Sequence, residues 1–309
     1  MKNVRVSAFL GLIGFLIIVY GFAPYVWGPG LSNPEPVGKF LNGNFQNINN
    51  STEPYRIAFQ NLKFDSPLNF NIVPNQSKII VGQRNGKIYW FEDDESTTQK
   101  NLLLDLSNEV GVIWDGGFLG MVIHPEFGTN GKNFIYSFYN TKDAEGNDSP
   151  DFAASFRCGI ERFYGNYLQL VRFEVNPLTM EYVPNSKLTM MKMRLYNTSH
   201  RGGGMSFGND GFLYVTTGDQ GAYFNSQNIS TNLDGGVLRI DVDKDPNKSH
   251  PPIRTLSSSG AGETDEYSGV EYWIPNDNPF LDANGGIFEE YYSLGHRAPH
   301  RLTLDKQTG

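Results

Sequence analysis

The chain of 309 residues is long enough for one large domain or two small ones. Its 34 Gly, 17 Pro, 16 Tyr and 22 Phe, with only 19% charged residues, favour short strands joined by turns over a helical bundle. The formal net charge of −8 argues against a nucleic-acid partner, because phosphate binding requires clustered Lys and Arg. The single cysteine, Cys158, cannot form an intrachain disulfide. We therefore expect an all-β fold stabilised by burial and sheet pairing.

The N-terminal segment predicts engagement with a membrane. Residues 6–27 are almost wholly apolar and uncharged, follow Lys2 and Arg5, and match the length of a bilayer-spanning helix. The positive residues predict a cytoplasmic N-terminus, with the rest of the chain exported to the periplasmic or extracellular side. Residues 1–27 therefore form a signal anchor or, if cleaved, a signal peptide; a buried core helix is the remaining alternative. Residues 28–54, rich in Gly, Asn and Pro, predict a linker.

Residues 55–309 repeat one theme, an apolar strand, a polar turn and another apolar strand. In the first unit, strands flank Asn85-Gly86 within residues 78–91, a dipeptide that favours a two-residue type I′ hairpin turn. The second unit has predicted strands at residues 120–124, 134–139, 168–175 and 188–195. A third unit begins at Gly203, with strands at residues 211–217 and 236–242, and a fourth opens at Glu290. The polar residues 142–150 and 243–268 predict surface loops.

Such units, recurring about every 50 to 80 residues, predict the blades of a β-propeller with loop insertions. A β-sandwich is the alternative architecture. About three and a half units cannot close a ring, because strand edges and apolar faces would lack partners. We therefore expect a partial propeller in residues 55–309, continued beyond Gly309.

Three segments hold the candidate functional residues: Trp114–Phe127, Ser199–Gly221 and Ser293–Arg301. Each is expected at the start of the first strand of a blade, where side chains line the central channel of a propeller. His200 precedes three glycines, which leave its side chain open space. A converging His and Arg with a nearby Asp could perform general-base catalysis and stabilise negative charge. Spacing alone favours a turn role for His200, a structural role for His124 and a hydrogen-bonding cap at Asp219-Gln220.

Four ordered motifs resemble the glucose/sorbosone dehydrogenase family from about Phe64 to Gly309. They are G-F-L-G-M-V-I-H-P-E-F, H-R-G-G-G-M-S-F-G-N-D-G-F-L-Y-V-T-T-G-D-Q-G, G-G-V-L-R-I-D followed by I-P-N-D-N-P-F, and S-L-G-H-R-A-P-H. The resemblance implies a six-bladed propeller that binds pyrroloquinoline quinone, is assisted by calcium, and oxidises an aldose at C1 to the lactone. It also implies an electron acceptor such as a cytochrome or a quinone.

The resemblance assigns roles to individual residues. His200 would take the hydroxyl proton, and Arg297 would contact the cofactor and stabilise the charge that arrives there. Asp115 and its neighbour Trp114 would contact the sugar, while Ala298 and Arg201 would contact the cofactor. No metal ligand is assigned in this chain, and the calcium ligands are expected beyond Gly309.

The chain also departs from the family pattern. Asp115 replaces a Gln that touches the sugar, and Ser199 replaces an Asp before the base, which predicts a weaker partner for the imidazole. Ala298 stands where Asn is expected, and Gly236 where Lys is expected. These departures keep open a non-catalytic, extracellular binding module of the Hedgehog-interacting type. A third hypothesis is a propeller hydrolase or lactonase with a channel metal held by Asp115, His200 and His296.

Overall fold

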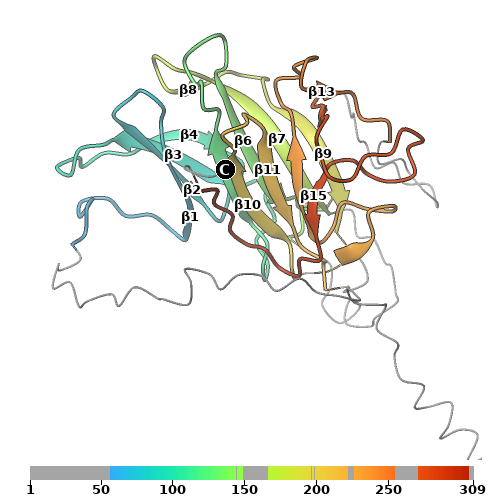
Figure 1. Cartoon of the computed structure of the whole chain (residues 1–309). Coiled ribbons are helices and arrows are strands. Elements are labelled where there is room, and N and C mark those ends of the chain that lie inside the picture. The colour runs from blue at the N-terminus through green and yellow to red at the C-terminus, as the bar shows by residue number, and fades with distance from the viewer. Residues whose placement is uncertain are drawn as a thin grey trace, which may run out of the picture. The chain divides into compact units, whose positions relative to one another are not determined.

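The computed structural model describes residues 56–143, 145–148, 166–195, 197, 199–221, 226–254 and 271–305 (Figure 1). The chain divides into two compact units, residues 1–56 and 57–309, and every strand described below lies in the second. Within the described ranges there is no α-helix, and hence none that could cross a membrane. The expected anchor at residues 6–27, the linker at 28–54 and Cys158 lie outside these ranges.

The first sheet is a four-stranded antiparallel meander. Its strands are β1 (Pro67–Ile72), β2 (Lys78–Gln83), β3 (Lys87–Glu92) and β4 (Asn101–Asp105). The predicted hairpin is confirmed, but the two-residue type I′ turn is wrong. Residues 84–86 form a three-residue loop, and of Asn85 and Gly86 only Gly86 has a positive φ, of 88°. One left-handed glycine after an ordinary turn is the geometry of a three-residue hairpin.

The second sheet confirms the four strands predicted between residues 120 and 195. It contains β5 (Phe118–Ile123), β6 (Phe134–Asn140), β7 (Tyr167–Asn176) and β9 (Leu188–Arg194), with the short β8 (Glu181–Tyr182) pairing with the end of β7. These strands are rich in β-branched and aromatic residues, which pack well on a pleated surface.

The third sheet corrects the expected number of units. Its strands are β10 (Gly202–Phe207), β11 (Leu213–Thr217), β12 (Gly236–Ile240) and β15 (Tyr291–Leu294). Because β15 pairs with β12, with Gly236 opposite Leu294, it completes this sheet and does not open a fourth unit. The segment between them holds β13 (Ser249–His250) and β14 (Ile274–Pro275), which pair as a short ribbon. Of the two strands, β13 lies within residues 243–268, where only a surface loop was predicted.

Two apolar clusters hold the three sheets together. Ile80, Ile88, Phe118 and Tyr139 belong to the cluster shared by the first and second sheets. A larger cluster, including Leu168, Met191, Leu213 and Leu238, joins the second sheet to the third. Strands β5 and β10 approach so closely that a Cβ at Gly120 would lie 2.3 Å from the carbonyl oxygen of Gly203. Glycine is required there because any side chain would separate the sheets.

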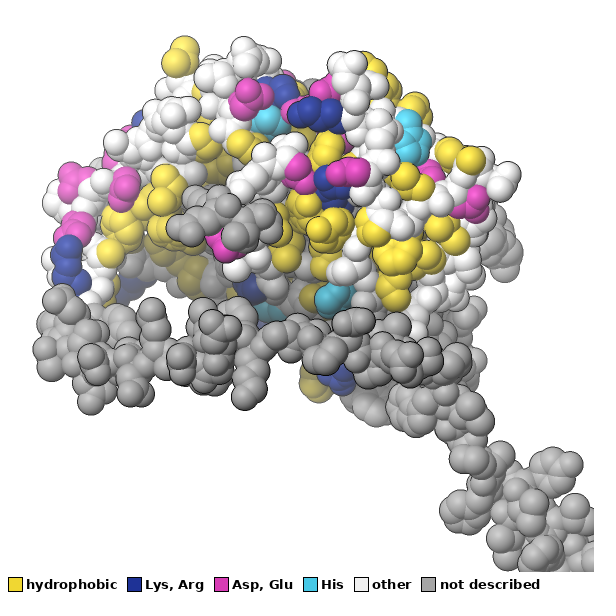
Figure 2. Space-filling model, in the orientation of Figure 1, with side chains coloured by type: hydrophobic (Ala, Val, Ile, Leu, Met, Phe, Trp, Pro, Cys, Tyr) yellow, Lys and Arg dark blue, Asp and Glu magenta, His cyan; other side chains and the backbone are white. Residues whose placement is uncertain are grey.

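The first and third sheets each carry a second apolar face. Successive strand residues point to opposite faces, so Ile79 and Val81 lie opposite Ile80 and pack under Phe59, Leu62 and Phe64. On the third sheet, Phe212, Tyr214 and Val237 contact Leu302 and Leu304. Hydrophobic side chains are visible at the surface over this sheet (Figure 2). The all-β class is therefore confirmed, while the six-bladed ring and the N-terminal helix stay predictions.

Candidate functional site

Strand pairing brings His200 together with Asp219. Gly202 of β10 is paired with Thr217 of β11, and continuing this antiparallel register by two residues places His200 opposite Asp219. Gly218 allows the close approach, because a Cβ there would lie 1.8 Å from the carbonyl oxygen of His200. A main-chain hydrogen bond also joins the two segments, because the Gln220 N–H donates to the His200 carbonyl oxygen at 3.2 Å.

The hydrogen bonds of this pair define the state of the imidazole. His200 Nδ1 lies 2.7 Å from Asp219 Oδ1, which also accepts the Gly221 N–H at 2.8 Å. A carboxylate can only accept, so we assign the hydrogen to Nδ1 and leave Nε2 as the basic nitrogen. The His200 side chain is 15% exposed, and among the described residues Nε2 has no hydrogen-bond partner. His200 therefore has the arrangement of an oriented general base.

The segment Trp114–Phe127 contacts His200 through Asp115. Its Oδ2 accepts the backbone N–H of His200 at 2.9 Å. Trp114 beside it is 58% exposed, and its carbonyl accepts a hydrogen bond from Arg84. The residues predicted to contact the sugar thus lie next to the predicted base, although Asp115 is already engaged with the backbone of His200.

The third motif also converges here, through its main chain. It begins with Ser293 and Leu294, the last two residues of β15, and continues beyond that strand to Arg301. Its place at the start of a first strand stays a prediction. The carbonyl of Arg297 accepts the Asp219 N–H at 2.9 Å, which places residue 297 beside the partner of His200. The side chains of Arg297 and Ala298 are exposed. Convergence of the backbones agrees with the predicted pairing of His200 and Arg297, and contact between their side chains stays a prediction.

Arg201 occupies a different environment from Arg297. Its side chain is 2% exposed, and burial lowers its pKa to about 10, although the negative charge of Asp115 acts in the opposite direction. A contact between this buried side chain and a cofactor stays a prediction.

Three non-glycine residues of this group have a positive φ. Trp114, His200 and Gln220 have φ angles of 45°, 55° and 52°, in the left-handed region that non-glycine residues rarely adopt. Such conformations persist only where the surroundings impose them, and they are often found at functional sites. Here the imposing contacts are the hydrogen bonds of Asp115, Asp219 and Gln220 described above.

Two departures from the family pattern acquire physical explanations. The predicted loss of an orienting partner at Ser199 is wrong, because Asp219 supplies that partner from the neighbouring strand. At Gly236, a Cβ would lie 2.4 Å from the ring of Tyr291, so no larger side chain fits this arrangement. The only sequence signal for Asp219 was its position two residues beyond the strand that ends at Thr217; its place opposite His200 follows from the pairing of β10 with β11.

The hypothesis of a hydrolase or lactonase with a channel metal is not supported by any ligand cluster within the described ranges. There, no three His, Cys, Asp or Glu side chains are close enough together to hold a metal ion. Asp115 and His200 are adjacent, while His296 Nε2 lies 2.8 Å from Ser293 Oγ.

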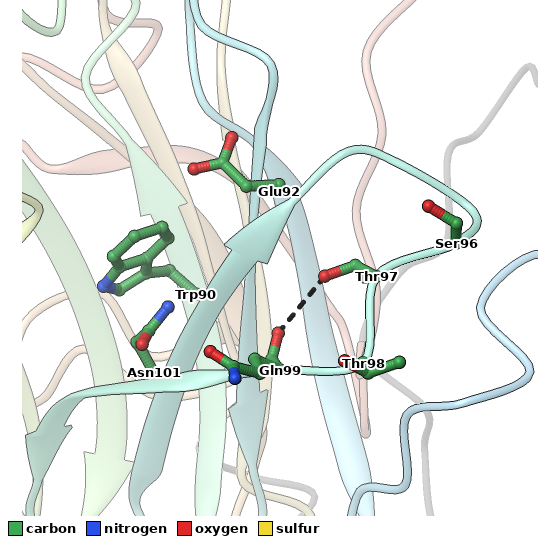
Figure 3. A pocket seen from close by; sticks show the side chains of 7 residues that line it. All are labelled: Trp90, Glu92, Ser96, Thr97, Thr98, Gln99 and Asn101. Carbon is green, nitrogen blue, oxygen red and sulfur yellow. Dashed lines mark hydrogen bonds between the residues drawn. The ribbon is translucent and has the colours of Figure 1, made fainter.

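A separate hollow of about 290 Å³ lies beside the β3–β4 loop, lined by Trp90, Glu92, Asn101 and residues 96–99 (Figure 3). Its lining side chains already have local contacts. Glu92 pairs with Lys78 at 3.4 Å, and the Thr97 hydroxyl donates to the Gln99 carbonyl at 3.4 Å. The hollow contains none of the residues that surround His200.

Comparison with known proteins identifies relatives by sequence. The family model of glucose/sorbosone dehydrogenase matches residues 64–260. The HIPL2 protein of Arabidopsis thaliana is 27% identical over 91% of this chain and 43% of its own length. Human Hedgehog-interacting protein is 24% identical over 62% of this chain and 22% of its own. The chain thus spans less than half the length of the curated relatives it matches.

Solved structures show a similar fold. A glucose dehydrogenase superimposes with a TM-score of 0.52 at 16% identity, covering 79% of this chain and 60% of that one. The aldose sugar dehydrogenase of Streptomyces coelicolor, determined with pyrroloquinoline quinone bound, gives a TM-score of 0.48 at 20% identity, covering 76% and 52%.

Proposed function

Because the chain belongs to the glucose/sorbosone dehydrogenase family, we propose that it is part of a quinoprotein that oxidises an aldose or related sugar at C1 to the lactone. The observation that carries the proposal is the His200–Asp219 pair. The partly exposed imidazole has a buried carboxylate on Nδ1 and, among the described residues, no hydrogen-bond partner on Nε2, and it lies beside the segment that carries Arg297.

The chemistry of each residue follows from its contacts. Nε2 of His200 takes the proton of the sugar C1 hydroxyl, because Nδ1 already holds a hydrogen directed at Asp219. The Asp219 carboxylate stabilises the imidazolium that results and prevents the ring from turning. The exposed guanidinium of Arg297 offers a fixed positive charge for the negative charge that develops on the acceptor side.

The positive charge of Arg297 is the feature of the site that fits pyrroloquinoline quinone, which is a polyanionic quinone. Arg297 is an exposed cation beside the His200 pair and would hold the cofactor, with Ala298 next to it and Arg201 behind. When bound, this cofactor supplies the two-electron oxidant that accepts the C1 hydrogen as hydride. Calcium belongs to the proposal as an assisting ion, with no ligand assigned among the described residues.

The cellular setting is part of the same proposal. An exported protein, tethered by residues 6–27, would meet sugars on the periplasmic or extracellular side and pass electrons to a cytochrome or a quinone. It would have no nucleic-acid partner, in agreement with the net charge of −8.

A second candidate is a non-catalytic extracellular binding module. It is favoured by the names of the sequence relatives, which include Hedgehog-interacting protein, and by Ala298 and Gly236, which depart from the dehydrogenase pattern. In such a module the His200–Asp219 contact would be structural.

Titration with pyrroloquinoline quinone and calcium, followed by aldose oxidation assays, separates the two candidates. We expect a quinone absorbance change on binding, and His200→Ala should lower turnover by about 10²- to 10⁴-fold while leaving quinone binding largely intact. The matched control is His250→Ala, which replaces the histidine of β13 in the separate ribbon and should leave turnover unchanged.

Unchanged turnover in His200→Ala would remove this histidine from the mechanism. Absence of quinone binding and of aldose oxidation in the wild-type protein would reject the dehydrogenase in favour of the binding module.

A further inference from the structure

A second buried carboxyl group lies behind the His200–Asp219 pair. Asp234 is 2% exposed and sits in the turn that precedes β12. Gln220 connects the two carboxyl groups: it follows Asp219 directly in the chain, and its Nε2 donates to Asp234 Oδ1 at 2.9 Å. The same amide nitrogen donates to the Arg194 carbonyl at 2.9 Å, so both of its hydrogens are engaged.

The main chain around Asp234 is held as firmly as its side chain. The Gly235 N–H donates to the Gly218 carbonyl at 2.9 Å, which ties this turn to the one that carries Asp219. The Tyr291 hydroxyl donates to the Asp234 carbonyl at 2.8 Å. Any displacement of the Asp234 side chain is therefore transmitted to Gln220, whose left-handed backbone adjoins His200.

We infer that Asp234 is a positioning residue for His200, acting through Gln220 on the turn that holds Asp219 and through its charge on the basicity of the imidazole. The effect of Asp234 on catalysis rests on the proposed function. The coupling between Asp234 and the His200–Asp219 pair is independent of that function.

The electrostatic environment supports the second part of the inference. Burial raises the pKa of Asp234 to about 7; the hydrogen bond from Gln220 opposes this rise, and the charge of Asp219 adds to it. Protonated Asp234 leaves Asp219 as the negative neighbour of His200, whereas ionised Asp234 adds a second negative charge. Ionisation of Asp234 therefore changes the charge beside the turn that holds Asp219.

Other ionisable groups around Asp234 have separate roles. Burial, followed by the charges of Asp234 and Glu290, raises the pKa of Tyr291 far above its ordinary value, so its hydroxyl stays protonated. Glu290 accepts the Tyr272 hydroxyl at 2.7 Å, and the backbone N–H of His296 donates to Gly235. The charge that raises the pKa of Asp234 beyond the effect of burial is that of Asp219.

Nuclear magnetic resonance titration of the full chain between pH 4 and 9 tests the inference without a catalytic assay. The Asp234 carboxyl carbon and the His200 ring are followed in wild type, in Asp234→Asn, and in Asp93→Asn, which removes the same charge from an exposed position near β3. In wild type we expect the Asp234 carbon to titrate near neutral pH and the His200 signal to show a second inflection at the same pH.

In Asp234→Asn the second inflection should vanish, because the group that titrates near neutral pH has been removed. Asp93→Asn should leave that inflection unchanged. An Asp234 carbon that titrates near its ordinary value, or a His200 curve identical in wild type and Asp234→Asn, would overturn the inference.

If Asp234→Asn does not fold, Gln220→Met provides the test, because it removes the amide bridge and keeps both carboxyl groups. We expect the Asp234 midpoint to rise, since the hydrogen bond that lowers it is lost; an unchanged midpoint would overturn the inference. Coupled titration in a protein that oxidises no sugar would reject the dehydrogenase and leave this coupling standing.

Discussion

The described part of the chain contains two His–Asp pairs whose surroundings differ. His200 meets Asp219 through Nδ1 at 2.7 Å, and its side chain is 15% exposed. His124, just after β5, meets Asp243 through Nε2 at 3.3 Å and is only 3% exposed. His124 Nδ1 accepts the Glu126 N–H at 3.1 Å, so this ring has a neighbour at both nitrogens.

The comparison shows what makes a histidine available for chemistry. A general base needs one nitrogen oriented and the other open to a substrate, which His200 has and His124 lacks. His124 instead packs against Tyr136 and Phe207, with ring centroids 6.4 and 5.3 Å away, and so joins the second sheet to the third. The same pair of residue types therefore serves as a candidate catalytic group in one place and as a structural contact in the other.

The largest expected effect is a loss of turnover when Asp219, but not Asp243, is replaced. Asp219→Asn should lower turnover by about 10²- to 10⁴-fold, because an amide can present a donor to Nδ1 and favour the wrong tautomer. Asp243→Asn makes the same chemical change at the other pair and should leave turnover of the folded protein unaltered. Steady-state kinetics of both variants, loaded with quinone, measure the contrast; equal effects would erase the distinction.

The next effect is on stability, where the substitution at His124 should have a larger effect than the substitution at His200. His124→Ala should lower the free energy of unfolding by about 2–4 kcal/mol, because it leaves a cavity between Tyr136 and Phe207 and removes the contact with Asp243. His200→Ala should cost less, since its ring is more exposed. Urea denaturation of both variants provides the measurement, and a greater loss in His200→Ala would contradict the structural role of His124.

The smallest effect is a dependence of stability on pH at Asp243. Partial burial alone would raise its pKa, but the nearby imidazole of His124 and the ion pair with Lys132 outweigh this and lower it to about 2. A carboxyl group with a lowered pKa in the folded state stabilises the fold above its ordinary pKa, and that stabilisation is lost as pH falls toward 2.

We therefore expect Asp243→Asn to be less stable than wild type at pH 7, by less than about 1 kcal/mol after solvent screening, with the difference shrinking between pH 4 and 2. Thermal unfolding across this range tests it. A difference that stays constant down to pH 2 would show that the charge of Asp243 contributes nothing.

Local patterns predicted much of the fold and less of the site. The strands of the second sheet were predictable because their apolar residues and flanking turns are contiguous in the chain. β15 was misassigned because a four-residue strand carries no sign of which strand it pairs with, and β12 lies more than fifty residues earlier. His200 could be named from its motif, whereas the importance of Asp219 and Asp234 depends on contacts across strands and turns.

The sequence by itself determined the all-β class, the family, and the choice of His200 as the residue to examine, because these depend on composition and on motifs within short stretches. Only the tertiary structure decided which carboxylate orients the imidazole. Ser199 is its chain neighbour, but the register of β10 against β11 brings Asp219, nineteen residues away, within hydrogen-bond distance of the ring. Antiparallel pairing makes distant residues adjacent, and no local pattern records that choice of partner.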